Sequence, residues 1–312
     1  MNFKYSSIGI FGKPGDESLG STIFSIIEAI SKIDDSITIY LESETAKFSK
    51  IESPNKSTKN HIHLMTINEM KNSIELAIVI GGDGTLLGIA RKLATYGTHL
   101  IGINQGRLGF TTDLDIRDIL IELPPLILGK GVIEKRDMLN VSIVRKNKKK
   151  IEEKIFNVPA LNDAVVNRGA ISNMVELDVF VANQYLQTIR GDGLIVCTPT
   201  GSTAYALSAS GPIIHPMLPS IALVPIAPQA LSSRPIMLPL DLEIQIFVKN
   251  GRGTILHCDM QTVAELNDED IIQVKQSELK VNLLHPKHYD YFSVLRKKLN
   301  WSANPTWRKD SN

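Results

Sequence analysis

Asp83 stands among three glycines in the stretch GGDGT, residues 81–85. Glycines let the backbone turn through φ > 0 and let a ligand approach closely. A helical pattern begins after Thr85, and a helix start directs free N–H groups and a partial positive charge back at the turn, where a phosphate would sit. A plain helix cap by Asp83 or Thr85 is the alternative, but one cap does not require three glycines.

Two later stretches have residue types suited to binding a base or a sugar. NQGRLGF (104–110) follows an apolar run, and its Phe110 could stack on an aromatic base; an ordinary Asn- and Gly-rich loop is the alternative. LNDAVV (161–166) places an amide, Asn162, next to a carboxylate, Asp163. This pair could bind an adenine edge and ribose hydroxyls, or it could be turn chemistry at a strand start.

The longest such stretch is RGDGLIVCTPTGSTAYALSASGP, residues 190–212. It combines a Gly-Asp-Gly turn, an apolar strand, and a Gly-Ser-Thr turn that leads into a helix. Ser202 or Thr203 is expected to cap that helix, and 204–208 to form its first turn. A plain hairpin would not need so many Gly, Ser and Thr residues, so we expect room for a ligand here.

In the first half of the chain, short apolar strands alternate with helical patterns. Isoleucines recur at helical spacing between Ile23 and Ile33, and leucines do so after Thr85. This alternation predicts an α/β domain with a parallel, doubly wound sheet, in which ligands bind at the carboxyl ends of the strands. Asp83 follows such an end. The expected strands are Ser7–Gly12, Ser36–Leu41, Leu76–Ile80 and His99–Asn104.

From about Met138 the apolar period changes to two, which predicts an all-β, antiparallel domain. A turn is expected at KNGRG (249–253) and a solvated hairpin tip at KNKKKIEEK (146–154). The tail from His288 to Trp301 is expected to be a helix whose aromatic residues dock it on the body. The expected domains are an α/β domain at 1–137, a β-rich domain at 138–285 and a helical tail at 286–312.

Composition narrows the function classes. With 43% hydrophobic and 21% charged residues and a net charge of +1, the chain is globular and has no overall charge suited to nucleic acid or an anionic membrane. Cys197 and Cys258 lie apart in apolar runs, as buried thiols of a reducing cytosol do. The N-terminus is too short and polar for a signal peptide and no 18-residue apolar run occurs. We expect a cytoplasmic protein.

Taken together, these stretches resemble the NAD kinase family, in particular its Gram-negative-type bacterial members. The resemblance runs over almost the whole chain, from GGDGT through NxGxLGF, the Asn-Asp pair and GDGLIVxTPTGSTAY to CDMQ (258–261) and HPKHYDYF (285–292). It implies transfer of the γ-phosphoryl group of ATP to the 2′-hydroxyl of the adenosine ribose of NAD, which gives NADP. It also implies a divalent metal, expected to be Mg²⁺ with ligands left unknown, and a homodimer or homotetramer.

The resemblance also implies site residues. Asp83 becomes the proton acceptor for the 2′-hydroxyl or the group that orients it, and Phe110 a contact near the adenine. The glycine-rich turn at Gly81, Gly82 and Thr85 is expected to bind phosphate, with any capping role left to Thr85. The implied dinucleotide contacts are Gly84, Asn162, Asp163, Arg190, Asp192, Thr203, Ala204, Tyr205, Ala206, Leu207, Ser208 and Gln261.

The chain departs from the family at two positions. Asp163 stands where many members have Glu, which puts the contact distance in doubt, and Asn173 stands where relatives often have His or a basic residue. Lipid kinases and phosphofructokinases share GGDGT but would lack TPTGSTAY. A non-catalytic dinucleotide sensor could use the same residues without turnover. An NAD-linked oxidoreductase fits less well, because GIFGKPG (9–15) is not G-x-G-x-x-G.

Overall fold

A computed structural model describes residues 5–51, 61–106, 109–146, 152–170, 173–249 and 253–301. It divides the chain into two compact units: unit 1 comprises Met1–Glu134 and Val281–Asn312, and unit 2 comprises Lys135–Lys280. The hairpin tip expected around 147–151 and the turn expected around 250–252 lie outside the described residues. The domain limits expected from the sequence stay a prediction.

The sheet of unit 1 is parallel. Its strand order is β3-β2-β1-β4-β5, and the end of β18 continues it beyond β5 in the same direction. The short β6 (Leu114–Asp115) also pairs with β5 in parallel. The main strands are β1 (Ser7–Gly12), β2 (Thr38–Glu42), β3 (Ile62–Met65), β4 (Leu76–Ile80), β5 (His99–Asn104) and β18 (Ile271–His285).

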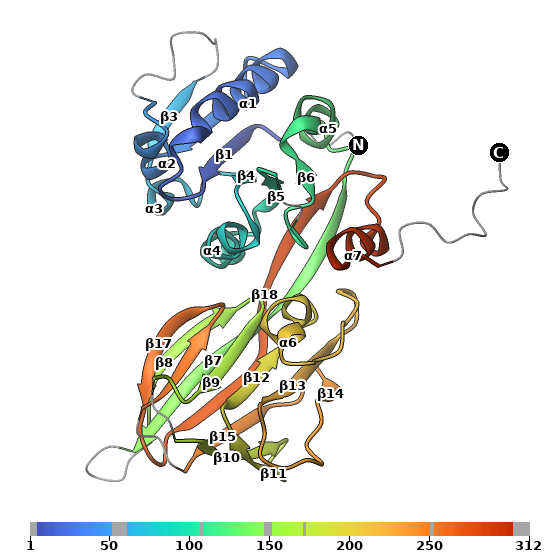
Figure 1. The fold of residues 1–312 in the computed structure, drawn as a ribbon. Helices are drawn as coiled ribbons and strands as arrows, with labels where there is room; N and C mark the ends of the chain where they lie inside the picture. The colour runs from blue at the N-terminus through green and yellow to red at the C-terminus, as the bar shows by residue number, and fades with distance from the viewer. Residues whose placement is uncertain are drawn as a thin grey trace, which may run out of the picture. The chain divides into compact units, whose positions relative to one another are not determined.

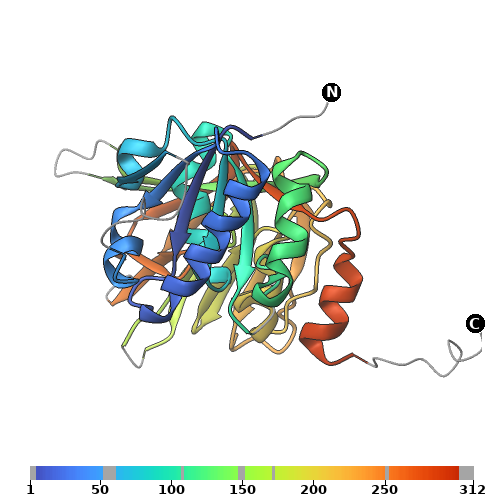
Figure 2. The same ribbon diagram turned by 90° about the horizontal axis from the view of Figure 1, so that it is seen from above.

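Helices cover both faces of this sheet. The isoleucines of α1 (Gly20–Ile33) recur every three or four residues, so they form one buried stripe, which packs with α5 (Ile119–Ile127) on Ile10, Ile78 and Ile101. Figure 2 shows α1 and α5 side by side on this face. The crossover through α4 (Asp83–Leu93) runs along the sheet in the opposite direction, so a right-handed connection places α4 on the other face, as Figure 1 shows. The doubly wound sheet is therefore confirmed.

The connection from β1 to β2 and the connection from β4 to β5 run in opposite directions along the sheet, so the topology reverses between β1 and β4. In an open α/β sheet such a switch point is where ligands bind, at the carboxyl ends of the strands. The segment 81–85 leaves β4 at this point. The remaining helical segments of unit 1 are η1 (Glu17–Leu19), α2 (Ser43–Phe48), α3 (Ile67–Met70), η3 (Ala94–Tyr96), η4 (Ile116–Asp118) and α7 (Tyr291–Leu299).

Unit 2 consists of two sheets whose strands pair antiparallel. One has the order β11-β10-β15-β18, with β7 paired to β18 and β8 paired to β7, and the other has the order β14-β13-β12-β9-β16-β17. Alternate residues such as Val141, Leu177, Val166 and Leu194 point into one shared apolar core, as the period of two predicts. The strands not yet bounded are β7 (Val132–Lys146), β8 (Glu152–Ala160), β9 (Asp163–Asn167), β10 (Val175–Val181), β11 (Gln184–Gly191), β12 (Gly193–Cys197), β13 (Ser220–Ile226), β14 (Ile236–Pro239), β15 (Ile244–Val248), β16 (Thr254–Cys258) and β17 (Gln261–Leu266).

The helix predicted after Gly201 differs from its expectation. A 3₁₀ turn, η5 (Gly201–Thr203), precedes α6 (Tyr205–Ser208), whose N-cap is Ala204 without a side-chain bond. The prediction that Ser202 or Thr203 caps the helix is therefore wrong. Instead, the Ser202 hydroxyl is buried and donates to the carbonyl of Pro199.

The tail helix also differs in how it packs. α7 buries the aliphatic Val294 and Leu295, whereas Phe292 is 58% exposed. Of the tail's aromatic residues, Tyr289 stacks on His285. Both cysteines are buried and neither forms a disulfide, as expected. No helix among the described residues combines the length and apolar character that crossing a bilayer requires.

Candidate active site

Asp83 is the first residue of α4, and Gly82 before it is the N-cap. No side chain makes a capping bond at this helix start. The predictions of a cap by Thr85 or Asp83 are therefore wrong: Thr85 lies two residues inside the helix, with its side chain over Gly81. The Asp83 carboxylate instead accepts hydrogen bonds from the loop after β5.

The Asp83 carboxylate accepts hydrogen bonds from three consecutive residues, Phe110 to Thr112, which we call the 110–112 turn. Its Oδ2 accepts the Phe110 N–H at 2.9 Å. Its Oδ1 accepts the N–H and hydroxyl of Thr111 at 3.0 and 2.7 Å, and those of Thr112 at 3.1 and 3.2 Å. Because bonds to an ionised acceptor are the stronger kind, this carboxylate fixes the turn against the start of α4.

These bonds also set the charge of Asp83. Burial raises its pKa, but the bonds from Phe110, Thr111 and Thr112 outweigh burial and hold the pKa below the ordinary 3.8. A lowered pKa means that Asp83 contributes stability above its unfolded-state pKa, and that this contribution is lost as the pH falls through the lower folded value. At neutral pH the group is an anion and a weak base.

The glycines around Asp83 have separate roles. A Cβ at Gly81 would lie 2.7 Å from Thr85 Oγ1, and one at Gly109 would lie 2.2 Å from Asp83 Oδ1, so both positions are closed to larger residues. A Cβ at Gly82 or Gly84 would meet no atom of the described residues within 4 Å. These two glycines are thus not required by packing, and the space beside them is open to a ligand.

The start of α4 keeps donors free. Among the described residues, no acceptor is found for the N–H groups of Gly82, Asp83 and Gly84, whereas Gly81 donates to Ile103 at 2.8 Å. Successive unpaired N–H groups at a helix N-terminus form an anion site. The sequence expectation of a phosphate-binding turn at 81–85 stays a prediction, and this geometry supports it.

The loop after β5 is held from both sides. Asn104 is buried and donates through Nδ2 to the carbonyls of Thr112 and Leu114. Phe110 is partly buried, and the ammonium of Lys298 lies 5.3 Å from the centre of its ring. The residues Arg107 and Leu108 of the NQGRLGF stretch lie outside the described part of the chain.

In unit 2, the carboxylate of Asp259 accepts backbone N–H groups from three consecutive residues, as that of Asp83 does in unit 1. The Asp259 carboxylate accepts the N–H groups of Leu161 at 2.9 Å, Asn162 at 2.7 Å and Asp163 at 3.2 Å. The Asn-Asp pair is thereby fixed at the start of β9. Sequence reasoning missed Asp259 as a positioning group, although CDMQ was part of the resemblance and only Gln261 was selected from it.

The TPTGST segment packs against the Asn-Asp pair. The Thr198 hydroxyl donates to the Leu161 carbonyl at 2.6 Å, and the Thr198 N–H donates to the Asn162 carbonyl at 2.9 Å. A Cβ at Gly201 would lie 2.1 Å from the Asn162 oxygen, so only glycine fits there. Three stretches distant in sequence therefore meet at one place in unit 2.

Asp163 is an unusual carboxylate. It is 1% exposed, and neither of its side-chain oxygens has a hydrogen-bond partner among the described residues. Burial, with the neighbouring charge of Asp259, raises its pKa to about 7. A buried carboxyl group without a donor is an incomplete acceptor, and a ligand hydroxyl or amine could complete it if the residues around it move.

Arg190 and Asp192 lie at the other end of β12 from the Asn-Asp pair. Across β9 and β12, Gly193 pairs with Asn167 whereas Cys197 pairs with Asp163. Arg190 is bonded to Glu176 at 2.9 Å. The structure therefore does not bring Arg190 next to the Asn-Asp pair.

Asp192 forms an ion pair with Arg168 at 2.8 Å and shares a cavity of about 400 Å³ with Tyr205 and His257. Burial lowers the pKa of His257. Tyr205 is 40% exposed, whereas the next residue, Ala206, is buried in the core around α6. The remaining predicted contacts are at least partly accessible, namely Thr203, Ala204, Leu207, Ser208 and Gln261.

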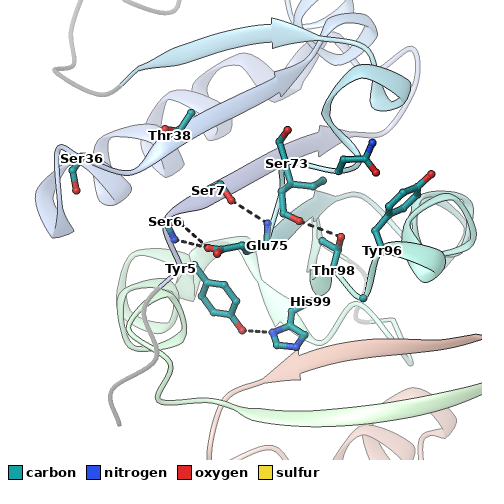
Figure 3. Close-up of a pocket in the computed structure, with 13 residues that line it drawn as sticks. Tyr5, Ser6, Ser7, Ser36, Thr38, Ser73, Glu75, Tyr96, Thr98 and His99 are labelled. Atoms are coloured by element: carbon teal, nitrogen blue, oxygen red, sulfur yellow. Dashed lines mark hydrogen bonds between the residues drawn. The ribbon is translucent and has the colours of Figure 1, made fainter.

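A larger cavity, of about 730 Å³, lies at the amino ends of the strands of unit 1, whereas Asp83 follows the carboxyl end of β4 (Figure 3). Its polar groups bond to one another: Tyr5 Oη lies 2.5 Å from His99 Nδ1, and Glu75 accepts the N–H and hydroxyl of Ser6. Burial, with the charge of Glu75, raises the pKa of Tyr5 to about 12. Because ligands of such sheets bind at the carboxyl ends, we do not place the active site here.

Sequence reasoning missed three further residues that shape the site. Thr111 and Thr112 hold Asp83, and Arg136, which is buried in unit 2, donates to the Thr200 hydroxyl at 3.2 Å. The threonines directly follow NQGRLGF and could have been found by extending that stretch. Arg136 had no signal in the sequence.

The α/β unit with free N–H groups at its switch point, and the β unit with an incomplete acceptor, are typical of a nucleotide-binding protein. Family models agree with this class. The ATP-NAD kinase N-terminal domain matches residues 8–130, and the ATP-NAD kinase C-terminal domain matches residues 161–286.

Relatives give the same result. An NAD kinase of Burkholderia thailandensis is 41% identical over 310 residues, 99% of each chain, and one of Ralstonia nicotianae is 50% identical over 239 residues, 77% of this chain and 78% of that protein. The chain belongs to the NAD kinase family.

Solved structures share the fold. A yeast NADH kinase in complex with NADH has a TM-score of 0.85 at 22% identity, covering 98% of this chain and 90% of that one. An NAD kinase from Archaeoglobus fulgidus in complex with ATP has a TM-score of 0.68 at 23% identity, covering 95% and 96%. The fold class expected from the sequence is confirmed.

The glycines give a first prediction. We expect Gly81→Ala to lower the free energy of unfolding by about 1–3 kcal/mol, because its Cβ must displace Thr85. Gly84→Ala is the matched control and should be neutral or stabilise by about 0.5–1 kcal/mol, because alanine is the better helix residue and meets no atom there. Urea unfolding of both variants measures this, and equal stability would contradict the packing described.

Asp163 gives a second prediction. Its folded pKa of about 7 lies above the ordinary 3.8, so the folded protein binds the extra proton and loses stability as the pH rises between these values. An asparagine side chain in its place does not titrate. Relative to the wild type, Asp163→Asn should therefore become more stable from pH 4 to pH 8, by at most about 4 kcal/mol. Urea unfolding at both pH values measures this, and a pH-independent difference would contradict the raised pKa.

Proposed function

We propose that this protein transfers the γ-phosphoryl group of ATP to the 2′-hydroxyl of the adenosine ribose of NAD, and that Asp83 is the residue that acts on this hydroxyl. Membership of the NAD kinase family supports the reaction. The observation that supports the role of Asp83 is its place at the switch point, as an anchored anion beside three N–H groups that have no acceptor among the described residues.

The start of α4 suits the phosphates. The N–H groups of Gly82, Asp83 and Gly84 and the helix dipole favour an anion there. Gly82 and Gly84 leave the backbone bare, so a phosphate can approach it closely. Phosphoryl transfer passes through a loose transition state in which positioning and charge neutralisation count for more than a strong base.

Of the two roles expected for Asp83, we favour that of orienting the hydroxyl. Four donors already reach Oδ1, whereas among the described residues Oδ2 accepts the Phe110 N–H alone and can take a further donor. The lowered pKa makes Asp83 a weak base but a permanent acceptor. The 2′-hydroxyl would donate to Oδ2, and this bond would aim the 2′-oxygen at the γ-phosphorus. As the new O–P bond forms and the bond from the γ-phosphorus to ADP breaks, the hydroxyl proton would pass late to Oδ2 and from there to water.

The dinucleotide contacts are assigned to unit 2 and to Phe110. Asp163 has no hydrogen-bond donor among the described residues, and the hydroxyls of a ribose or the amine of an adenine would supply one. Tyr205 and Asp192 line one polar cavity. Ala206 can contribute through its backbone only, since its side chain is buried. The other assigned contacts are Asn162, Arg190, Thr203, Ala204, Leu207, Ser208 and Gln261.

No group of three or more His, Cys, Asp or Glu side chains suited to a metal ion occurs among the described residues. The donor set thus does not fit a metal held by protein alone. Mg²⁺ commonly binds through substrate phosphates and water with few protein ligands. We therefore assign the divalent cation to the phosphates of ATP, where it would neutralise charge. A cytoplasmic location and a homodimer or homotetramer are further proposals.

One assay tests the reaction. The protein is incubated with NAD, Mg²⁺ and ATP carrying a labelled γ-phosphate, and the product is analysed by phosphorus NMR and with an NADP-specific dehydrogenase. We expect labelled NADP with the phosphate on the 2′-oxygen. Diacylglycerol, sphingosine and fructose 6-phosphate serve as competing acceptors. Their phosphorylation in place of NAD, or NAD binding without turnover, would contradict the proposal.

The role of Asp83 gives a third prediction. Asp83→Asn keeps the size of the side chain but removes the charge, so we expect kcat to fall by about 10²–10⁴-fold with a much smaller change in the KM for NAD. Thr111→Val is the matched control: it removes one donor to Asp83 but leaves the anion, so its loss should be about tenfold at most. Steady-state kinetics measure both, and a near-normal kcat in Asp83→Asn would refute the assignment.

A further inference from the structure

His285 lies between two carboxylates inside unit 1. It ends β18 and is 2% exposed. Its Nδ1 is 2.9 Å from Asp113 Oδ2, and its Nε2 is 3.2 Å from Glu134 Oε2, at ion-pair distance but outside hydrogen-bond geometry. The ring of Tyr289 stacks on the imidazole with centres 3.9 Å apart. Asp113 and Glu134 are themselves largely buried, with side chains 7% and 14% exposed.

Asp113 directly follows the 110–112 turn. The N–H and hydroxyl of Thr112, the residue before it, bind Asp83, and the carbonyls on either side of Asp113, those of Thr112 and Leu114, both accept from Asn104. Asn104 thus fixes the backbone around Asp113, and His285 fixes its side chain. A movement of Asp113 would be passed to Thr112 within one residue.

We propose that the His285 imidazolium is a positioning residue for phosphoryl transfer: through Asp113 it holds the 110–112 turn, and with it the Asp83 carboxylate, in the reactive position. This inference rests on the proposed function. His285 does not touch the reacting atoms, and Glu134 holds the cation in place from its other side.

The wild-type arrangement requires a protonated His285, because each of its two ring nitrogens faces a carboxylate. A neutral imidazole has one N–H and one lone pair, so it cannot face two carboxylates favourably. Burial lowers the pKa of His285, but Asp113 and Glu134 outweigh burial and raise it. The contribution of the cation is therefore complete below the ordinary pKa of 6.5 and is lost as the pH rises through the folded value. A second histidine of unit 1, His288, pairs with Glu122 at 3.7 Å.

Two matched substitutions separate positioning from plain structural support. The amide nitrogen of Asn falls near the Nδ1 of His, and that of Gln near the Nε2, so His285→Asn can still donate to Asp113 whereas His285→Gln donates towards Glu134. The two side chains carry the same amide and differ by one methylene. A residue needed only for folding would be impaired in both.

The experiment compares kcat and KM for NAD in the wild type, His285→Asn and His285→Gln from pH 6 to pH 10, with the folded fraction checked by circular dichroism. We expect the wild-type kcat to fall as His285 deprotonates, with KM unchanged. His285→Asn should keep kcat within about threefold and lose that pH step, whereas His285→Gln should lose up to about 100-fold in kcat, as a misplacement near 1 Å does.

Equal kcat values in two folded variants, or an unchanged alkaline step in His285→Asn, would overturn the positioning role. If both variants fail to fold, Glu134→Gln replaces them: it removes one neighbouring charge and should move the alkaline step of kcat to lower pH, and an unmoved step overturns the proposal. If the wild type forms no NADP, the proposed function fails. The same assay separates that result from a failure of the positioning role, which requires an active wild type.

Discussion

The bonds between the Asp83 carboxylate and the 110–112 turn are the interaction on which the active region of unit 1 depends. Five donors from three residues converge on one anion. Hydrogen bonds to a charged group contribute about 1.5–3 kcal/mol each in favourable cases, so the turn is fixed more firmly than a loop of small residues could be by packing. The same bonds keep the Asp83 carboxylate ionised.

Unit 2 repeats this arrangement with a different outcome. Asp259 accepts three consecutive N–H groups and fixes the segment 161–163, yet the carboxylate that this segment presents, Asp163, receives no donor among the described residues. Asp83 has hydrogen-bond donors and a lowered pKa, whereas Asp163 has none among the described residues and a raised pKa. The Asp83 carboxylate is therefore hydrogen-bonded and ionised before a ligand binds, whereas the Asp163 carboxyl group would receive its hydrogen bonds from the ligand.

Local patterns in the sequence predicted much of this fold. The bounds of β1, β4 and β5 agree with their predicted ranges, because buried parallel strands are continuous apolar runs that end at glycine or asparagine. Helix α5 was not predicted, since Pro124 and Pro125 lie inside it and interrupt the helical signal. The predicted caps were wrong because the N-caps of α4 and α6 are Gly82 and Ala204, which have no side-chain oxygen to accept from the first N–H groups of the helix.

The partners within the site could not be predicted in the same way. Asp83 and Thr111 are 28 residues apart and Asp259 and Leu161 are 98 apart, and no periodicity reports which distant N–H groups a carboxylate will meet. Only the fold brings them together.

The central claim is that the 110–112 turn holds Asp83 as a permanent anion. The most direct measurement is a carbon-13 NMR titration of the aspartate carboxyl groups, with the Asp83 signal assigned by its loss in Asp83→Asn. We expect this signal to titrate below the ordinary pKa of 3.8 and to stay constant from pH 5 to pH 9. A midpoint at or above the ordinary value would contradict it.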